Sequence, residues 1–308
     1  MKSFVKIALV LGLFISIYSC QPDDSSSVTP PRAYDEVYNE EIAKIEEFLE
    51  THYVTVDVDF NTTFTKIPDG GTQTPVADMP QLDFKEVDLH DITYKIYYLK
   101  LREGLGQSPT RVDSTFVGYK GDRLFKGVVD NVPTFTINPF ENNPNPIWFT
   151  LDRVIRGWAE IIPEFKTGTF GSNPDGTVSY QDFGAGVMFL PSGVAYFNTV
   201  RPGIPSYSIL MFNFKLYNLQ YMDHDRDRIL SKDEYGDPTN PNRFKLDAID
   251  TDGDGRVDYL DTDDDGDGRI TKSEIQIPST NPPQYYDFLS IPLCNSTGKK
   301  IHLASECR

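Results

Sequence analysis

Positive charge is scarce in this chain of 308 residues, which has 29 lysine and arginine residues against 46 acidic ones and a formal net charge of −17. Because nucleic-acid binding needs clustered Lys and Arg to release counterions from phosphates, we expect no nucleic-acid partner. Histidine and cysteine are also rare, with four and three residues, and no Cys/His cluster suggests a zinc site. No Ser/His/Asp or Cys/His arrangement typical of nucleophilic enzymes is evident. These absences favour a function that needs neither zinc nor a covalent step.

Apolar and acidic residues, in contrast, are plentiful. Hydrophobic residues make up 39% of the chain and aromatic residues 13%, enough for a sizeable core and too many for a disordered chain. The length favours about two domains. The negative charge is concentrated, because residues 221–274 hold 17 acidic and 8 basic side chains, a net −9 that is about half of the total. This acidic segment therefore needs an explanation of its own.

The first 19 residues have the features of a secretory signal peptide, since two lysines precede an apolar run from Ile7 to Tyr18 that is too short for a membrane span. Ile17-Tyr18-Ser19-Cys20 resembles the lipobox of bacterial lipoproteins, in which the cysteine is lipidated and becomes the first residue. An ordinary signal peptide with an incidental cysteine is the alternative. Residues 20–33 are expected to form a tether. Acidic residues after Cys20 resemble a surface-export signal, so we expect a lipid anchor in the outer membrane of a diderm bacterium, facing the periplasm or the cell surface.

The two other cysteines, Cys294 and Cys307, lie near the C-terminus. In an oxidising compartment an even number of cysteines favours a disulfide. Such a bond would close a short loop and contribute about 3 kcal/mol by the loop-entropy model. Two free thiols are the alternative.

Hydrophobic periodicity predicts an α+β middle part. Tyr34 to His52 has the i, i+4 spacing of an amphipathic helix, and from Val54 to Phe60 apolar residues alternate with polar ones as in a half-buried strand. A short helical pattern returns over residues 151–162. Further strands are predicted at 92–101, 115–119, 186–190, 194–197 and 209–219. Mostly antiparallel strands with one short helix are expected.

A series of short motifs occurs in this middle part, between residues 94 and 219. In order they are Gly104-Leu105-Gly106 with Pro109, Val117-Gly118-Tyr119-Lys120-Gly121, Leu124-Phe125, Trp148-Phe149, Val154-Ile155-Arg156-Gly157-Trp158, Val194-Ala195-Tyr196, Pro202-Gly203-Ile204-Pro205 and Leu210-Met211-Phe212-Asn213-Phe214. Together they resemble the FKBP-type peptidyl-prolyl cis-trans isomerases. The resemblance implies a twisted antiparallel sheet wrapped on one short helix, and isomerisation of Xaa-Pro bonds in polypeptide substrates such as exported proteins.

The resemblance also implies a pocket. It maps onto Tyr119, Phe125, Phe149, Val154, Ile155, Trp158, Tyr196, Ile204 and Phe212. Trp158 would form the floor under the proline ring, while the Ile155 backbone N–H and the Tyr196 hydroxyl would hydrogen-bond substrate carbonyls. An Xaa-Pro amide loses resonance and polarity when it twists, so a dry aromatic pocket favours the twisted form. No cofactor is expected for catalysis. Packing in the core is the alternative role of these side chains.

Two departures from the family pattern affect the expected activity. Lys126 follows Phe125 where the family usually has an acidic residue, and the flap between Tyr196 and Pro202 is short. Insertions near Asn138 to Pro146 and Gly168 to Tyr180 are expected to lengthen loops. The alternative function is a non-catalytic calcium-binding scaffold or partner-binding lipoprotein with this fold.

The acidic segment contains three candidate calcium loops in the 12-residue EF-hand frame, where carboxylates at positions 1, 3, 5 and 12 and a backbone carbonyl at position 7 surround one cation. The frame with the full pattern, including glycine at position 6, has Asp263, Asp265, Asp267, Arg269 and Glu274 as ligands. A second comprises Asp250, Asp252, Asp254, Arg256 and Asp261, and also resembles a thrombospondin type 3 repeat. The remaining frame, which comes first along the chain, comprises Asp223, Asp225, Asp227, Ile229 and Glu234.

Arg228 replaces the turn glycine in the frame that begins at Asp223, which is therefore expected to bind more weakly. The frames lie too close together for full EF-hand helix pairs. An acidic solvated segment without metal is the alternative. About two or three structural calcium ions are expected.

The predicted organisation follows from these patterns. It comprises a signal peptide (1–19), a lipidated tether (20–33), a helix and strand extension (34–90), an isomerase-like domain (91–220), a small loop-rich calcium module (221–276) and a tail with the disulfide (277–308). Apolar residues from Tyr285 to Leu293 are candidates for docking on the isomerase-like domain.

Overall fold

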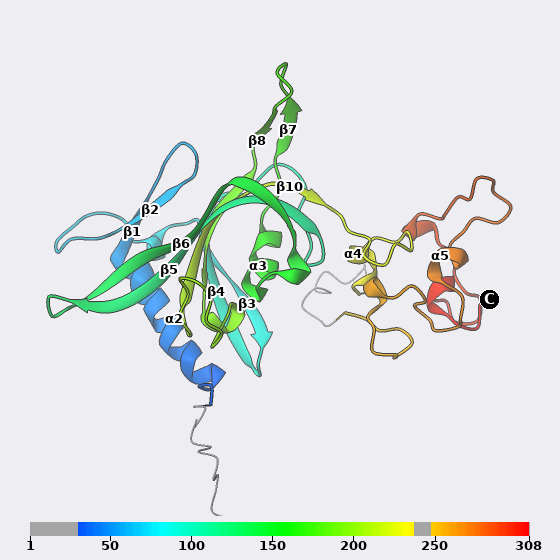
Figure 1. Ribbon diagram of the computed structural model, residues 1–308, viewed down its shortest axis with the longest axis horizontal. Helices are drawn as coiled ribbons and strands as arrows, with labels where there is room; N and C mark the ends of the chain where they lie inside the picture. The colour runs from blue at the N-terminus through cyan, green and yellow to red at the C-terminus, as the bar shows by residue number, and fades with distance from the viewer. Residues whose placement is uncertain (1–29, 237–247, 308) are drawn as a thin grey trace, which may run out of the picture. The chain divides into compact units, whose positions relative to one another are not determined.

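The computed structural model describes residues 30–236 and 248–307, so the predicted signal peptide and Cys20 lie outside the described residues. The described part is mixed α and β, with antiparallel strands and few helices (Figure 1). Its α-helices are α2 (Tyr34–Thr51), α3 (Arg156–Ile161), α4 (Ser231–Glu234) and α5 (Thr271–Glu274). Short 3-10 turns are η1 (Val76–Asp78), η2 (Leu151–Arg153), η3 (Ile162–Glu164), η4 (Ser192–Val194), η6 (Asp258–Leu260), η7 (Phe288–Ser290) and η8 (Ile301–Leu303).

A six-stranded antiparallel sheet forms the centre, with the strand order β3-β4-β9-β10-β5-β6. Its strands are β3 (Leu82–Leu89), β4 (Ile92–Arg102), β5 (Ser114–Val129), β6 (Val132–Thr150), β9 (Gly184–Leu190) and β10 (Ile209–Gln220). The sheet curves around the short helix α3 (Figure 1). The predicted antiparallel sheet on one short helix is therefore confirmed.

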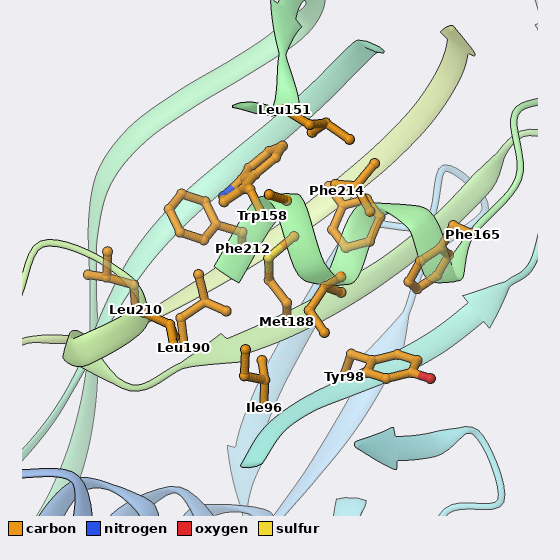
Figure 2. Packing of buried hydrophobic residues seen from close by; sticks show 14 of the residues in the cluster. Ile96, Tyr98, Leu151, Trp158, Phe165, Met188, Leu190, Leu210, Phe212 and Phe214 are labelled. Atoms are coloured by element: carbon orange, nitrogen blue, oxygen red, sulfur yellow. The ribbon is translucent and has the colours of Figure 1, made fainter. Parts of the chain in front are cut away.

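Both faces of the sheet are buried, which explains the unbroken apolar sequence of β9. Met188 and Leu190 point to the face covered by α3, while Val187 and Phe189 pack on the opposite face against α2. Figure 2 shows the α3 side, where Trp158 and Phe212 lie together beside Phe214. Because successive strand residues alternate between faces, a strand covered on both sides has no polar alternation.

Helix α2 covers its face of the sheet as its periodicity predicts. Ile45, Phe48 and Leu49 are buried in one cluster with residues of β4, β9 and β10. The Phe48 ring lies 5.4 Å from that of Phe135 and 6.3 Å from that of Phe189, centroid to centroid. The aromatic residue at position 48 thus joins the helix to both β6 and β9.

Replacing Phe48 by alanine is expected to lower the free energy of unfolding by about 3–5 kcal/mol, because a large buried side chain leaves a cavity that its neighbours fill only in part. Urea denaturation followed by circular dichroism measures this loss. Val58→Ala is the matched control, since Val58 is 93% exposed and its truncation should change stability by less than about 0.5 kcal/mol. Equal stabilities of the two variants would contradict the packing role of Phe48.

The strand predicted from Val54 to Phe60 is wrong in its second half. Strand β1 (His52–Val56) ends before Asp57, and β2 (Thr62–Lys66) returns antiparallel to it. The Asp57 carboxylate accepts hydrogen bonds from the backbone N–H groups of Asp59 and Asn61, which closes a turn. The hydrogen bonds of the Asp57 side chain therefore form an Asx-type turn, which ends the strand although the alternation of apolar residues continues to Phe60.

The two insertions form strands, whereas longer loops near the pocket were expected. Residues 138–146 lie inside β6, and the second insertion forms a hairpin of β7 (Thr169–Ser172) and β8 (Val178–Gln181). Strand β6 is an edge of the sheet and contains Pro133, Pro139, Pro144 and Pro146. Its register against β5 shifts between Val117 and Tyr119 and again between Gly121 and Asp122, which accommodates the extra residues.

The apolar residues of the tail pack on the acidic loops. Ile291 is buried in a small cluster with Ile229 and Ile275, and Tyr285, Tyr286, Phe288 and Ile301 pack against it. Cys294 and Cys307 form the predicted disulfide, with their Cα atoms 5.7 Å apart. The acidic loops thus obtain their hydrophobic core partly from the tail.

Candidate functional site

An aromatic cavity of about 860 Å³ opens beside α3. Trp158, which is 4% exposed, lies in its wall, and three rings meet the indole edge to face: Tyr119 and Phe149 at 5.1 Å and Phe212 at 5.2 Å between centroids. Edge-to-face packing fixes these rings against one another. The cavity therefore has a rigid aromatic wall built from β5, β6, α3 and β10.

The start of α3 supplies the next part of the cavity lining. Val154 and Ile155 line the cavity just before the helix, and Ile155 has extended backbone angles (φ −60°, ψ 145°) as the N-cap residue. In the ranges that the structure describes, no protein atom accepts a hydrogen bond from the Ile155 N–H. This group is thus available to a ligand carbonyl, as the resemblance implies.

The rim is formed by the segment after η4. Tyr196 and Ile204 line the cavity, and reciprocal backbone hydrogen bonds of 2.9 Å between Arg201 and Ile204 close the turn that carries Pro202. The Arg201 guanidinium lies 5.4 Å from the centroid of the Tyr196 ring. The short flap therefore places an arginine, not an aromatic residue or histidine, at the rim.

Phe125 is the one residue of the mapped pocket that does not line the cavity. Its side chain is 50% exposed on β5, and the following Lys126 pairs with Glu47 of α2. Phe140 of β6 occupies the cavity wall instead, with its ring centroid 5.7 Å from that of Phe212. A Cβ atom on Gly121 would lie 2.6 Å from Phe140 Cζ, so glycine at 121 leaves room for this ring.

Glu141 follows Phe140 and also lines the cavity. The chain therefore does have an acidic residue immediately after a pocket phenylalanine, and the departure inferred from Lys126 is wrong. The β6 register shift explains the error: Gly121 pairs with Glu141 and Asp122 with Pro139, so Phe140 is the extra residue of a bulge that faces the cavity. The sequence signal was present in Phe140-Glu141, inside the segment interpreted as an insertion.

Burial raises the pKa of Tyr119 to about 12, and the neighbouring Glu141 carboxylate contributes to the rise. The Asn143 side chain donates a hydrogen bond of 2.8 Å to Glu141 Oε1. Tyr119 is therefore a neutral hydroxyl donor throughout the physiological pH range. Its role at the cavity is polar positioning, not proton transfer.

If the cavity has the prolyl isomerase activity that the resemblance implies, exchange of Glu141 for glutamine is expected to lower this activity about 3–10-fold, because the Tyr119 hydroxyl loses a charged neighbour at the cavity. Lys126→Glu is the contrasting variant, and we expect it to leave activity unchanged while it removes the ion pair with Glu47. Both are measured as kcat/KM on an Xaa-Pro peptide. A gain of activity in Lys126→Glu would restore the assignment of Phe125 to the pocket.

The three predicted acidic loops share one backbone geometry. In each loop the carboxylate at position 5 accepts the N–H of position 7: Asp227 from Ile229 (2.7 Å), Asp254 from Arg256 (2.7 Å) and Asp267 from Arg269 (2.8 Å). Position 6 has positive φ in all three, 94° at Arg228, 96° at Gly255 and 89° at Gly268. Arg228 therefore adopts a conformation that costs an ordinary residue about 1–2 kcal/mol.

Within each loop the carboxylates at positions 1, 3 and 5 converge. They offer oxygens that lie within 4.8 Å of one another in Asp223, Asp225 and Asp227, in Asp250, Asp252 and Asp254, and in Asp263, Asp265 and Asp267. Asp261 and Glu274, predicted at position 12, are not members of these clusters, although both Glu274 oxygens are buried without a hydrogen-bond partner among the described residues. That oxygen-rich chemistry suits a hard cation such as Ca²⁺.

A fourth cluster was missed by the sequence reasoning. Asp225 and Glu234 converge with Asp264, again with oxygens within 4.8 Å of one another. Burial, and secondarily the neighbouring carboxylates, raise the pKa of Asp225 to about 8, of Asp264 to about 9 and of Glu234 to about 11. The frame pattern assigns no ligand role to position 2, which Asp264 occupies, so spacing alone could not have identified it.

No helix within residues 30–236 or 248–307 has both the length and the apolar character that a membrane crossing requires. The predicted lipidation site and most of the tether lie outside these ranges.

Residues 224–300, which include most of the acidic loops and the tail, match a family model described as BamM C-terminal. None of the curated proteins is significantly similar to the sequence.

Solved structures similar to this chain include FkpA from Escherichia coli, with 21% identity over 60% of this chain and a TM-score of 0.35. A peptidyl-prolyl cis-trans isomerase from Pseudomonas syringae pv. tomato has 17% identity over 62% of this chain and 99% of its own, with a TM-score of 0.36. The N-terminal domain of FKBP42 from Arabidopsis thaliana has 16% identity over 45% of this chain and 92% of its own, with a TM-score of 0.31. The chain spans 62% of FkpA, less than two thirds of that protein's length.

Proposed function

We propose that the protein is an FKBP-type peptidyl-prolyl cis-trans isomerase that acts on Xaa-Pro bonds of exported polypeptides. One observation carries this proposal: Tyr119, Phe149, Trp158 and Phe212, which come from four separate elements, converge in one cavity as the motif resemblance requires. Val154, Ile155, Tyr196 and Ile204 complete the lining. A core role alone would not leave these rings around an open cavity.

The proposed mechanism needs no covalent step. A prolyl amide is planar and dipolar in the ground state, with a rotation barrier of about 18–20 kcal/mol, and it loses resonance as it twists. The Trp158 face and the surrounding rings offer little stabilisation to the planar dipole, so the less polar twisted amide binds better. The free Ile155 N–H holds a carbonyl of the substrate while the bond rotates.

The direct test is the rate of cis-trans exchange of an Xaa-Pro peptide, measured by NMR exchange spectroscopy with the protein from residue 21 onward. Acceleration above the spontaneous rate, which corresponds to tens to hundreds of seconds, supports the proposal. Binding of the peptide without acceleration would instead favour the non-catalytic scaffold.

We further propose that the acidic loops bind structural calcium. The observation that favours it is the threefold repetition of one loop geometry, in which the carboxylates at positions 1, 3 and 5 turn toward a common point. Extracellular calcium modules have dissociation constants of about 0.1–1 mM, which suits a permanently filled structural site outside the cell. The carbonyls of Ile229, Arg256 and Arg269 would complete the ligand sets.

We also propose a place of action. A lipid on Cys20 would anchor the protein to the outer membrane, and the match of residues 224–300 to a BamM C-terminal model supports an association with the outer membrane protein assembly machinery. Metabolic labelling with a palmitate analogue tests the anchor, with Cys20→Ser as the control that should abolish labelling. Unchanged labelling of Cys20→Ser would contradict lipidation at this residue.

A further inference from the structure

We propose that one divalent cation, calcium by its ligand chemistry, is held jointly by the first acidic loop (223–234) and the third (263–274), with Asp264 as the ligand that crosses between them. This cross-loop site comprises Asp225, Glu234 and Asp264, whose oxygens lie within 4.8 Å of one another. The inference rests on the proposed calcium function and adds to it a site that no single loop can form.

Burial distinguishes this cluster from an ordinary group of surface acids. Asp264 is 2% exposed and Glu234 is 7% exposed. Both carboxylate oxygens of each residue are buried, and within the described ranges no hydrogen-bond donor reaches any of these four oxygens. Asp225 Oδ2 is also buried and receives no hydrogen bond from the described residues. Ionised carboxylates in such surroundings need a compensating positive charge.

Among residues 30–236 and 248–307, no basic side chain pairs with a carboxylate of this cluster. Lys232, the basic residue of α4, pairs with Asp233, and the Arg228 guanidinium lies over the Tyr285 ring at 5.2 Å. None of the ion pairs formed in the described part of the chain includes a residue of the cross-loop site. A divalent cation would neutralise the negative charge of this buried cluster, whose ligand atoms are all oxygens. Calcium fits because it binds carboxylates from separate segments in flexible geometry.

The backbone explains why Asp264 points away from its own loop. It occupies position 2, and its N–H is held by Thr271 Oγ1 at 3.2 Å, at the start of α5. The same bond from position 2 to position 9 occurs in the other loops, from His224 to Ser231 Oγ (3.1 Å) and from Thr251 to Asp258 Oδ1 (2.7 Å). Of the three residues at position 2, only Asp264 is a carboxylate.

A second contact joins the same two loops. Lys272 Nζ of α5 donates a hydrogen bond of 3.3 Å to the backbone carbonyl of Arg226 in the first loop. The first loop is expected from its sequence to bind weakly because of Arg228. Asp264 adds a third buried carboxylate to Asp227 and Glu234, and the cross-loop site is the most buried of the acidic clusters. We therefore expect the cross-loop site to be the tightest of them.

The test uses calcium itself with the full chain from residue 21 onward, by isothermal titration calorimetry and calcium-dependent hydrogen exchange. Asp264→Asn keeps the shape of the side chain and removes its charge. We expect it to weaken the tightest calcium site about 10-fold or more. Calcium-induced protection of the first loop should be lost with it, although no residue of that loop has been changed.

Asp254→Asn is the matched control, since Asp254 belongs to the cluster of the second loop and is not a member of the cross-loop site. It should leave protection of the first and third loops intact. Glu234→Gln provides the reciprocal measurement and a second variant should Asp264→Asn fail to fold: calcium protection of residues 263–274 should fall although the change lies in the first loop.

Two results separate the inference from the calcium function on which it rests. If the unaltered protein binds no calcium, the calcium function itself fails. If it binds calcium and the Asp264→Asn protein retains the same affinities and first-loop protection, the cross-loop site is overturned while the separate loop sites stand.

Discussion

Substitution of Trp158 by leucine is expected to reduce kcat/KM on an Xaa-Pro peptide about 100-fold, a loss of about 2.7 kcal/mol in transition-state stabilisation. The indole meets Tyr119, Phe149 and Phe212 edge to face at 5.1–5.2 Å and forms the broad apolar surface against which a proline ring would twist. Leucine preserves apolar character in the core but has neither the area nor the ring geometry. The measurement is the cis-trans exchange rate at several protein concentrations.

Loss of folding must be separated from loss of activity in this variant, because Trp158 is also part of the core. Circular dichroism and the melting temperature show whether Trp158→Leu is folded. Phe125→Leu is the matched control. Phe125 belongs to the same family motif set but is exposed outside the cavity, so its substitution should leave activity within twofold, roughly the spread of surface variants. A folded Trp158→Leu protein with unchanged kcat/KM would remove the proposed isomerase site.

Removal of calcium at pH 7.5 is expected to unfold the acidic loops and expose them to trypsin. Each site filled at 100 times its dissociation constant contributes about 2.7 kcal/mol to stability, and without cations the convergent carboxylates repel one another. The loops contain their own cleavage sites, such as Arg256, whose side chain is 58% exposed. Mass spectrometry of fragments before and after chelation measures the effect.

The isomerase-like sheet provides an internal control for chelation. Both tryptophans of the chain, Trp148 and Trp158, lie in β6 and α3, outside the acidic loops. Tryptophan fluorescence should therefore stay unchanged while the loops become sensitive to protease, and added calcium should restore resistance. If the chelated protein resists trypsin as the calcium-loaded protein does, the acidic segment does not depend on calcium.

The difference between Phe125 and Phe140 shows where the reasoning from sequence stopped. Local spacing identified the short helix and the strands β4, β5, β9 and β10. The strand predicted at 194–197 is wrong, because this segment begins in the 3-10 turn η4 and continues as a turn. The motif order assigned the pocket phenylalanine to Phe125, the first Phe after Tyr119. The phenylalanine that lines the cavity is Phe140, because the pairing of β5 with β6 places it in a bulge. Pairing register depends on tertiary structure and is not encoded in one short motif.

In the acidic loops, too, the sequence predicted local structure but not the contacts between distant segments. The three frames coincide with three loops of one geometry, because the hydrogen bonds from position 2 to position 9 and from position 7 to position 5 join residues fewer than ten positions apart. Asp264 reaches a loop that begins 41 positions earlier in the chain, and no pattern within its own loop indicates this. The packing of the tail's apolar residues on Ile229 and Ile275 is likewise a contact between segments distant in the sequence, which spacing does not indicate.

The prolines of β6 have a consequence for how a substrate leaves. This strand forms the edge of the sheet and also contributes Phe140, Glu141 and Phe149 to the cavity. An unfolded polypeptide bound there lies beside an open strand edge, which ordinarily recruits extended chains by main-chain hydrogen bonds. Four prolines lack the N–H that such pairing needs. On the proposed function, a client chain would therefore be held by its proline ring and released without the need to break main-chain hydrogen bonds to the sheet.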